Sequence, residues 1–168
     1  DVLANVESVI GSTLADSLVG DAFANRLDGG TGNDTIEGRL GADTLDGGVG
    51  SDMVSYIGAS SGVTVDLSLA TAQIGTGDAA GDIPSNFEHL LGSNQSDTLT
   101  GDANANAIDG SAGADTIHGG GGADTLIGNT DDDILYGDAG DDLLQGLNND
   151  DVLDGGAGND TLDGGSGW

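Results

Sequence analysis

The sequence predicts an all-β fold, a right-handed parallel solenoid of two sheets in which 18 residues complete one coil. Three observations predict it: a nine-residue repeat that begins with Gly, a nearly constant acid at its sixth position, and an aliphatic residue at its eighth. Five such blocks fill residues 11–55 and eight fill residues 92–163, where "GGAGNDTLD" is the last. The sixth residue is Asp in all of them except two, which carry Asn25 and Asn106.

Each position of the block has a physical reading. Glycines at positions one, two and four permit the positive φ angles of a tight turn and keep Cβ atoms away from its inner surface. The last three residues, such as "TLD" at 161–163, form a short strand whose middle aliphatic points to one side. One turn and one strand make half a coil, so stacked coils form two parallel sheets with the aliphatics between them. The high glycine content disfavours helix.

Composition restricts the partners of the chain to cations. The 168 residues include 30 acids, two arginines and no lysine, for a formal net charge of −28. Such a surface repels nucleic acid and disfavours anionic membranes. We expect no membrane insertion, since no apolar run is long enough to span a bilayer. Without cysteine, neither disulfides nor thiolate metal sites can form.

The position-six residues are expected to form two columns, one along each edge of the stack. The first column contains Asp16, Asp34, Asp52, Asn106, Asp124, Asp142 and Asp160, and the second contains Asn25, Asp43, Asp97, Asp115, Asp133 and Asp151. Stacked strands lie about 4.7–4.9 Å apart. Carboxylates at that spacing repel one another unless cations lie between them.

Calcium is the cation that suits these columns. It takes 6–8 oxygen ligands in flexible geometry, whereas zinc and copper favour His or Cys. The expected carboxylate ligands are Asp16, Asp34, Asp43, Asp52, Asp97, Asp115, Asp124, Asp133, Asp142, Asp151 and Asp160. The expected turn glycines, which supply conformation and carbonyl oxygens, are Gly29, Gly32, Gly38, Gly41, Gly47, Gly50, Gly110, Gly113, Gly119, Gly122, Gly137, Gly140, Gly155 and Gly158. Adjacent acids in the two columns predict about six to nine Ca²⁺ ions.

The blocks match GGxGxDxUx, and the chain therefore resembles the hemolysin-type, repeats-in-toxin (RTX) calcium-binding family. The resemblance covers residues 11–55 and 92–168, most closely at "GGTGNDTIE", "GGVGSDMVS" and "GGAGNDTLD". It implies a parallel β-roll, a secreted parent protein exported by type I secretion machinery, and folding triggered by calcium outside the cell. Some blocks depart from the pattern at position four, where we expect weak or absent ion binding: Leu14, Phe23, Gln95, Asn104, Asp131 and Asn149.

A longer repeat divides the chain. "NVESVIGS" at 5–12 returns as "NFEHLLGS" at 86–93, an offset of four and a half coils, so the second module is expected to begin on the opposite edge. Glu7 and Glu88 are interpreted as caps. We expect a first roll at 1–55, a spacer or hairpin without calcium at 56–82, and a second roll at 83–168. Within the spacer, "GVTVDLSL" is expected to form a strand with which "TAQI" pairs.

No catalytic constellation is expected. "GASSG" at 58–62 fits the nucleophile-elbow pattern, but that motif needs a following helix, which this sequence does not support. His89 and His118 are interpreted as surface residues. The sequence therefore predicts a non-enzymatic calcium-binding module of a secreted protein. Three alternatives remain: the stalk of an adhesin or surface-layer protein, part of a secreted enzyme, or a polysaccharide-binding module. A protein or glycan target stays unknown.

Overall fold

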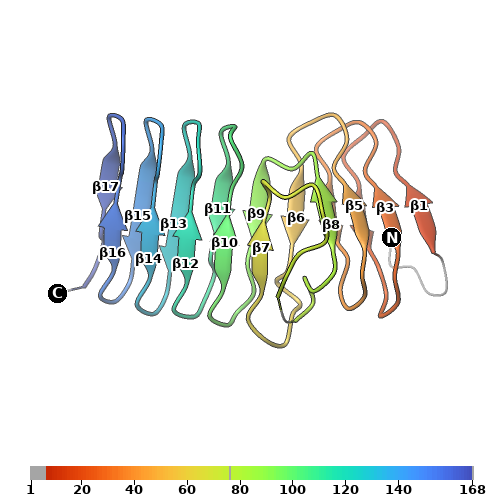
Figure 1. The fold of residues 1–168 in the computed structure, drawn as a ribbon, viewed down its shortest axis with the longest axis horizontal. Coiled ribbons are helices and arrows are strands. Elements are labelled where there is room, and N and C mark those ends of the chain that lie inside the picture. Colours follow the sequence, from red (N-terminus) through yellow and green to blue (C-terminus); the bar gives the residue numbers. More distant parts are fainter. Residues whose placement is uncertain (1–6, 76, 168) are drawn as a thin grey trace.

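The computed structural model describes residues 7–75 and 77–167, and within them it contains 17 short strands and no helix. One sheet has eight strands, in the order β17-β15-β13-β11-β9-β6-β4-β2. They are β2 (Ser17–Val19), β4 (Thr35–Glu37), β6 (Met53–Ser55), β9 (His89–Leu91), β11 (Ala107–Asp109), β13 (Thr125–Asn129), β15 (Leu143–Leu147) and β17 (Thr161–Asp163). The stack runs from β1 at one end to β17 at the other (Figure 1).

The opposite face consists of two sheets rather than one. The first has four strands: β1 (Ser8–Ile10), β3 (Arg26–Asp28), β5 (Thr44–Asp46) and β8 (Ile83–Ser85). The second has five: β7 (Thr64–Asp66), β10 (Thr98–Thr100), β12 (Thr116–His118), β14 (Ile134–Tyr136) and β16 (Val152–Asp154). Every strand pair is parallel, and regular coils pair residues 18 apart, as in Leu18 with Ile36. The predicted all-β parallel solenoid is confirmed.

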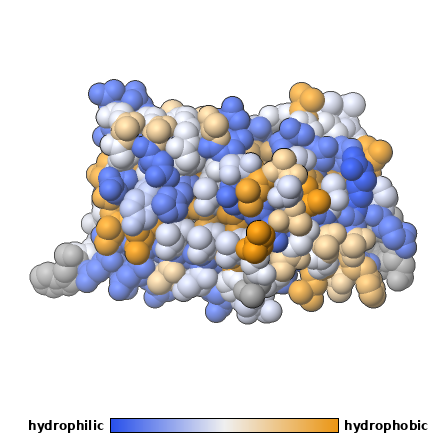
Figure 2. Space-filling view, viewed as in Figure 1, coloured by the Kyte–Doolittle hydropathy of each residue, from blue (hydrophilic) through white to orange (hydrophobic). Residues whose placement is uncertain are grey.

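The core is a ladder of position-eight aliphatics between the two faces. Twelve of them are at most 4% exposed: Leu18, Leu27, Ile36, Leu45, Val54, Leu90, Leu99, Ile108, Ile117, Leu126, Leu135 and Leu144. The ladder is open at the end of the stack formed by β16 and β17, where Figure 2 shows hydrophobic surface. The exposed apolar residues of those two strands are Val152 and Leu162. Burial of the ladder follows directly from the fixed period.

The glycines of the turn have two different roles, which corrects one part of the sequence interpretation. In most regular blocks, positions two and four adopt positive φ, as in Gly30 (φ 94°) and Gly32 (φ 127°), and so does Arg39 (φ 69°) at position two. Position one of the regular blocks does not adopt it. A Cβ on Gly29 would lie 2.5 Å from Oδ2 of Asp34, so glycine is needed there for space rather than for conformation.

Residues 56–85 contain two irregular blocks that split one face of the roll. "GASSGVTVD" at 58–66 ends in β7, which pairs with β10, and "GDAAGDIPS" at 77–85 ends in β8, which pairs with β5. The eight-stranded sheet is continuous past them because β6 pairs directly with β9. Residues 71–74 form no strand, contrary to the expected pairing of "TAQI". The threefold division of the chain stays a prediction.

The half-coil offset between the modules is confirmed. β1, which follows Glu7, lies in the four-stranded sheet, whereas β9, which follows Glu88, lies in the eight-stranded sheet on the opposite face. In the described residues, no helix is long and apolar enough to cross a membrane.

A core substitution in the ladder is expected to destabilise the whole stack. Leu126 is fully buried, so Leu126→Ala should lower the free energy of unfolding by about 2–5 kcal/mol through lost burial and a cavity. Urea unfolding in saturating calcium measures the change. Ile74 is 86% exposed, and Ile74→Ala should stay within about 0.5 kcal/mol of the parent. Equal effects of the two substitutions would contradict the ladder as the core.

Candidate metal centre

The position-six side chains connect each coil to the one before it. Oδ1 of each acid accepts the backbone N–H of the position-six residue 18 positions earlier. The N–H of Asp34 donates to Asp52 over 2.7 Å, and the N–H of Asp124 donates to Asp142 over 2.8 Å. The same bond recurs in the second column, from Asp115 to Asp133. The two acid columns that the sequence predicts are therefore continuous ladders, each carboxylate using one oxygen to hold the stack together.

The other carboxylate oxygen is buried without a hydrogen-bond partner in eight of these acids. They are Asp34, Asp43, Asp52, Asp115, Asp124, Asp133, Asp142 and Asp151, each through Oδ2. A buried acceptor without a partner costs about 1–3 kcal/mol, and more when it carries charge. Native structures rarely leave such atoms unpaired unless a water or ion serves them. Eight repetitions of one unpaired oxygen indicate a ligand that the protein chain does not supply.

Each unpaired oxygen lies beside the position-one glycine of its own turn, and at several of these glycines a carbonyl oxygen of the next coil lies close by, a pair of oxygens that we call the cradle. At Gly137, the place that a Cβ would occupy lies 2.5 Å from Oδ2 of Asp142 and 2.5 Å from the carbonyl oxygen of Gly155 in the next coil. The corresponding place at Gly119 lies 2.5 Å from Oδ2 of Asp124 and 2.7 Å from the Gly137 carbonyl oxygen. Because that place lies one bond length from the glycine Cα, it cannot itself hold a cation, but the distances show that a carboxylate oxygen and a carbonyl oxygen of successive coils lie close together, and calcium binds both kinds of oxygen.

A second kind of turn satisfies its position-six side chain internally. Oδ2 of Asp16 accepts the N–H and the hydroxyl of Ser12 over 2.6 and 2.8 Å. At Asp97, Oδ2 accepts the Ser93 N–H over 2.6 Å, and Oδ1 accepts the Val63 N–H over 2.7 Å. We call these closed turns, and those with positive φ at position two and an unpaired Oδ2 open turns.

The closed turns occur at the start of each module. Besides Asp16 and Asp97, they contain Asn25 and Asn106, whose Oδ1 atoms accept the N–H groups of Asp21 and Asp102 over 2.9 and 2.7 Å. The buried atom of Asn106 that lacks a partner is its amide nitrogen, a donor that repels a cation.

Position four separates the two kinds of turn. The four closed turns carry Leu14, Phe23, Gln95 and Asn104 there, and in each the side chain at position two accepts the position-four N–H. Asp131 and Asn149, which the sequence groups with them, instead adopt φ 76° and 78° as glycine does. Both belong to open turns, because Asp133 and Asp151 keep an unpaired Oδ2. Asp and Asn tolerate the left-handed region, which explains the difference.

Burial raises the pKa values of several position-six acids when no metal ion is bound. Desolvation raises the pKa of Asp115 to about 8, and the carboxylates of Asp97 and Asp133 add to the rise. Desolvation likewise raises the pKa values of Asp43, Asp124 and Asp133 to about 6. Backbone N–H donors lower these values without cancelling the desolvation. A bound cation would remove this penalty by compensating the charge.

The available ligands are one carboxylate per half-coil together with backbone carbonyls. Within residues 7–75 and 77–167, no three His, Cys, Asp or Glu side chains gather into a metal-binding group. This oxygen-only set lacks the imidazole and thiolate ligands typical of zinc sites and matches the needs of calcium. The residues present therefore fit calcium.

The structure adds position-six residues that the sequence interpretation did not include. Asp82 takes this place in the block at 77–85, since its Oδ1 accepts the Asp43 N–H over 2.9 Å. Glu88, which the sequence interpretation already placed at position six as a cap, continues the first column by accepting the Asp52 N–H over 2.9 Å. Val63 stands at position six of the block at 58–66 and offers no ligand. A search for G-x₄-D outside the nine-residue phase would have found Asp82.

Comparison with known proteins agrees with this geometry. A family model described as the RTX calcium-binding nonapeptide repeat (4 copies) matches residues 10–54, 87–117, 109–144, 118–153 and 136–167. A search of curated proteins finds no match.

A methyl group placed in the cradle is expected to disable it. In Gly137→Ala the new Cβ would collide with Oδ2 of Asp142 and the Gly155 carbonyl oxygen, and we expect weaker calcium binding and about 1–3 kcal/mol lower stability. Calcium titration calorimetry and urea unfolding measure the two effects. Gly164, also at position one, has no atom within 4 Å of that place, so Gly164→Ala is the matched control. Equal calcium affinity and equal stability in Gly137→Ala and Gly164→Ala would contradict the cradle.

The raised pKa values predict opposite pH dependence with and without calcium. The folded state holds protons that the unfolded state releases above 3.8, so metal-free stability should fall as the pH rises from about 4 to about 8, where Asp115 ionises. Calcium binding needs deprotonated ligands, so calcium-dependent stabilisation should rise over the same interval. Far-UV circular dichroism in chelator and in calcium at several pH values measures the folded fraction and therefore both trends. Metal-free stability that rose with pH would oppose this account.

Proposed function

Since the chain belongs to the RTX calcium-binding nonapeptide repeat family, whose repeats bind several calcium ions, we propose that it is a calcium-driven folding module of a secreted protein. In this proposal the metal-free chain is largely unfolded, and calcium outside the cell converts it into the β-roll. The observation that carries the proposal is the set of eight buried Oδ2 atoms without partners.

We assign the ions to the open turns and to the turn of Asp160, which shares their positive φ at position two (Gly156, φ 83°), with each ion between two stacked coils. The carboxylate ligands would be Asp34, Asp43, Asp52, Asp115, Asp124, Asp133, Asp142, Asp151 and Asp160, with carbonyl oxygens from the turn glycines. Asp16 and Asp97 are left out because their oxygens already accept the N–H groups of closed turns. Stacked pairs of open turns that both carry an acid then number about five, fewer than the six to nine expected from adjacent acids alone.

The energetics make calcium a plausible trigger. One site filled at about 100 times its dissociation constant stabilises the fold by about 2.7 kcal/mol, so about five sites would contribute about 13 kcal/mol. That matches the whole stability of an ordinary domain, about 5–15 kcal/mol. With a formal net charge of −28, the metal-free chain repels itself. Calcium therefore has enough free energy to decide whether the roll is folded.

This switch suits export through a narrow channel. Where calcium is scarce, the chain stays open and can pass through type I secretion machinery as an extended polymer. Where calcium is plentiful, folding and binding become one equilibrium. Folding on the far side would hinder return of the chain and would order whatever domain the roll is attached to.

Calcium titration of chelator-treated protein tests the proposal. Far-UV circular dichroism should show a cooperative gain of β-structure with calcium and little gain with magnesium, which gives up its waters reluctantly. Replacing both Asp124 and Asp142 by Asn should move the midpoint to a calcium concentration at least about tenfold higher, because two open turns lose their charge. A fully folded spectrum in chelator that calcium does not change would overturn the switch.

Asp97→Asn is the matched control for that experiment. Asp97 occupies position six like Asp124, but both of its oxygens already have hydrogen-bond donors. The number of ions bound should therefore stay that of the parent, although the midpoint should rise somewhat because the Asn amide nitrogen cannot accept one of these N–H groups. Loss of a bound ion in Asp97→Asn would show that acids in closed turns bind ions too.

A further inference from the structure

We propose that residues 56–75 and 77–105 form a nucleus that stays folded without calcium, from which the ion-dependent coils extend in both directions. The inference rests on the proposed function, because it assigns the calcium requirement to the flanks alone. Between Tyr56 and Ala105, no buried carboxylate oxygen of a described residue lacks a hydrogen-bond partner. On either side, Asp43, Asp52 and Asp115 each have one that does.

A tyrosine hydroxyl takes the role of the ion at Asp82. Like the ladder acids, Asp82 is fully buried and uses Oδ1 to accept the N–H of Asp43. Its Oδ2, however, accepts the hydroxyl of Tyr56 over 3.2 Å, and Tyr56 is 1% exposed. A donor supplied by the chain therefore satisfies the oxygen that would otherwise need a cation. Charged acceptors gain about 1.5–3 kcal/mol from such a bond.

Gln73 closes the gap between β7 and β8, which belong to different sheets. Its side-chain oxygen accepts the N–H of Asp66 over 2.8 Å, and its side-chain nitrogen donates to the Asp66 carbonyl over 2.8 Å. Its backbone N–H donates to the Asp82 carbonyl, and its backbone carbonyl accepts the Gly81 N–H. Gln73 is 5% exposed. One buried residue thus provides the hydrogen bonds of a missing strand.

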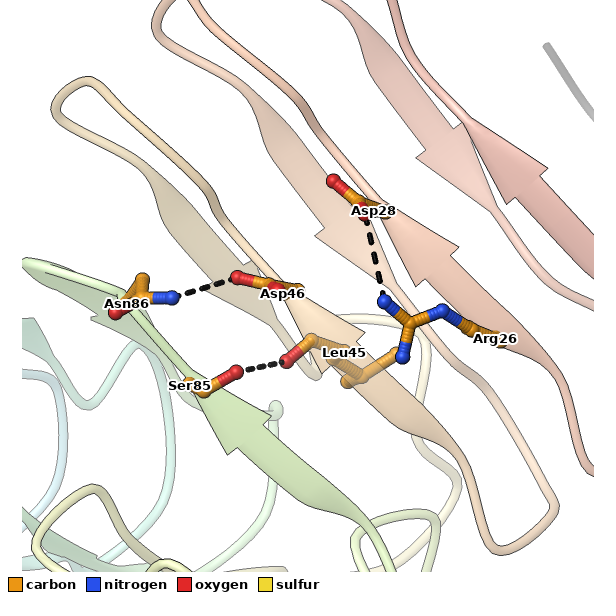
Figure 3. A network of polar contacts seen from close by, with 6 residues as sticks. All are labelled: Arg26, Asp28, Leu45, Asp46, Ser85 and Asn86. Atoms are coloured by element: carbon orange, nitrogen blue, oxygen red, sulfur yellow. Dashed lines mark hydrogen bonds and ion pairs between the residues drawn. The ribbon is translucent and has the colours of Figure 1, made fainter.

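Side-chain bonds also attach β8 to its neighbour β5. The hydroxyl of Ser85 donates to the Leu45 carbonyl over 3.2 Å, and the side-chain nitrogen of Asn86 donates to Asp46 over 2.7 Å (Figure 3). In the next coil of the first column, Glu88 accepts the Asp52 N–H. These bonds join the nucleus to the flanking coils at 45–52, so they fix where that flank docks once it becomes ordered.

The nucleus buries more apolar surface than the regular coils. Regular coils contribute only their position-eight aliphatics to the core, whereas this segment adds Tyr56, Ala59, Val63, Ala79 and Phe87 to the same cluster beside its position-eight residues. Full burial of a Phe or Val side chain contributes about 1.5–3 kcal/mol. The extra burial offsets the entropy of ordering these coils without the free energy of ion binding.

Hydrogen exchange of the whole chain, followed by mass spectrometry in chelator and in calcium, tests the inference. In chelator, peptides from 56–75 and 77–105 should stay protected while those from β12 to β17 exchange at least about tenfold faster. Calcium should then protect the flanks and change the nucleus little. Uniformly fast exchange in chelator with calcium-dependent protection everywhere would overturn the nucleus and leave the proposed function intact. Uniform protection in chelator that calcium does not alter would overturn both.

Tyr56→Phe removes only the hydroxyl and leaves Oδ2 of Asp82 without a donor. In chelator we expect exchange in the nucleus to accelerate by at least about tenfold. Tyr136→Phe is the matched control, because the half-buried Tyr136 ring lies in β14, outside the nucleus, where it stacks on His118. Equal protection in Tyr56→Phe and the parent would show that the Tyr56–Asp82 bond does not hold the nucleus together.

Discussion

Everything in this fold depends on burying one carboxylate in nearly every half-coil and giving its two oxygens different tasks. Oδ1 accepts the amide of the coil before it, so it sets the spacing and register of the stack, as the Asp34–Asp52 bond does. Oδ2 then lies beside the position-one glycine of its own turn and needs a positive partner of its own. A buried charge without a partner is too costly to keep, so the chain must either donate a hydrogen bond or take up a cation.

The backbone conformation at position two determines whether Oδ2 accepts a hydrogen bond from the chain or is left without a partner. At Ser12 the N–H points into the turn and satisfies Asp16. At Gly30, φ is 94° and Oδ2 of Asp34 has no partner. The difference is local, since a non-glycine residue at position four, such as Leu14, favours the closed form, in which its N–H bonds to the Ser12 side chain. The first two turns of each module are closed, so each module begins with coils whose acids are already satisfied.

The sequence predicts the regular coils well because one period determines them. An aliphatic every nine residues lands on alternate faces and points inward each time, which places Leu27, Leu126 and their counterparts without any knowledge of tertiary contacts. The acid columns follow from the same period. From the sequence, the closed turns could be distinguished from the open turns only in part. Asp131 and Asn149 are non-glycine residues at position four, as Gln95 and Asn104 are, but they adopt the positive φ typical of glycine.

The irregular segment could not be placed because its blocks leave the nine-residue phase. Val63 stands where an acid is expected and Pro84 where an aliphatic is expected, so neither block shows the pattern. The bonds of Gln73 and Tyr56 join residues 7 and 26 positions apart, distances that no repeat predicts. They depend on tertiary packing at the split between the two smaller sheets.

That split affects only one of the two acid columns. In the second column, Asp82 ends the run from Asn25, and Asp97 begins a new run behind Val63. In the first column, Glu88 accepts the Asp52 N–H, and β6 pairs directly with β9. The coils on either side of the split are therefore connected through the eight-stranded sheet and, on the other face, only through the side-chain bonds of Gln73 and Tyr56. In the proposed folding order the segment at the split is already ordered, so each group of open turns would extend from it independently of the other.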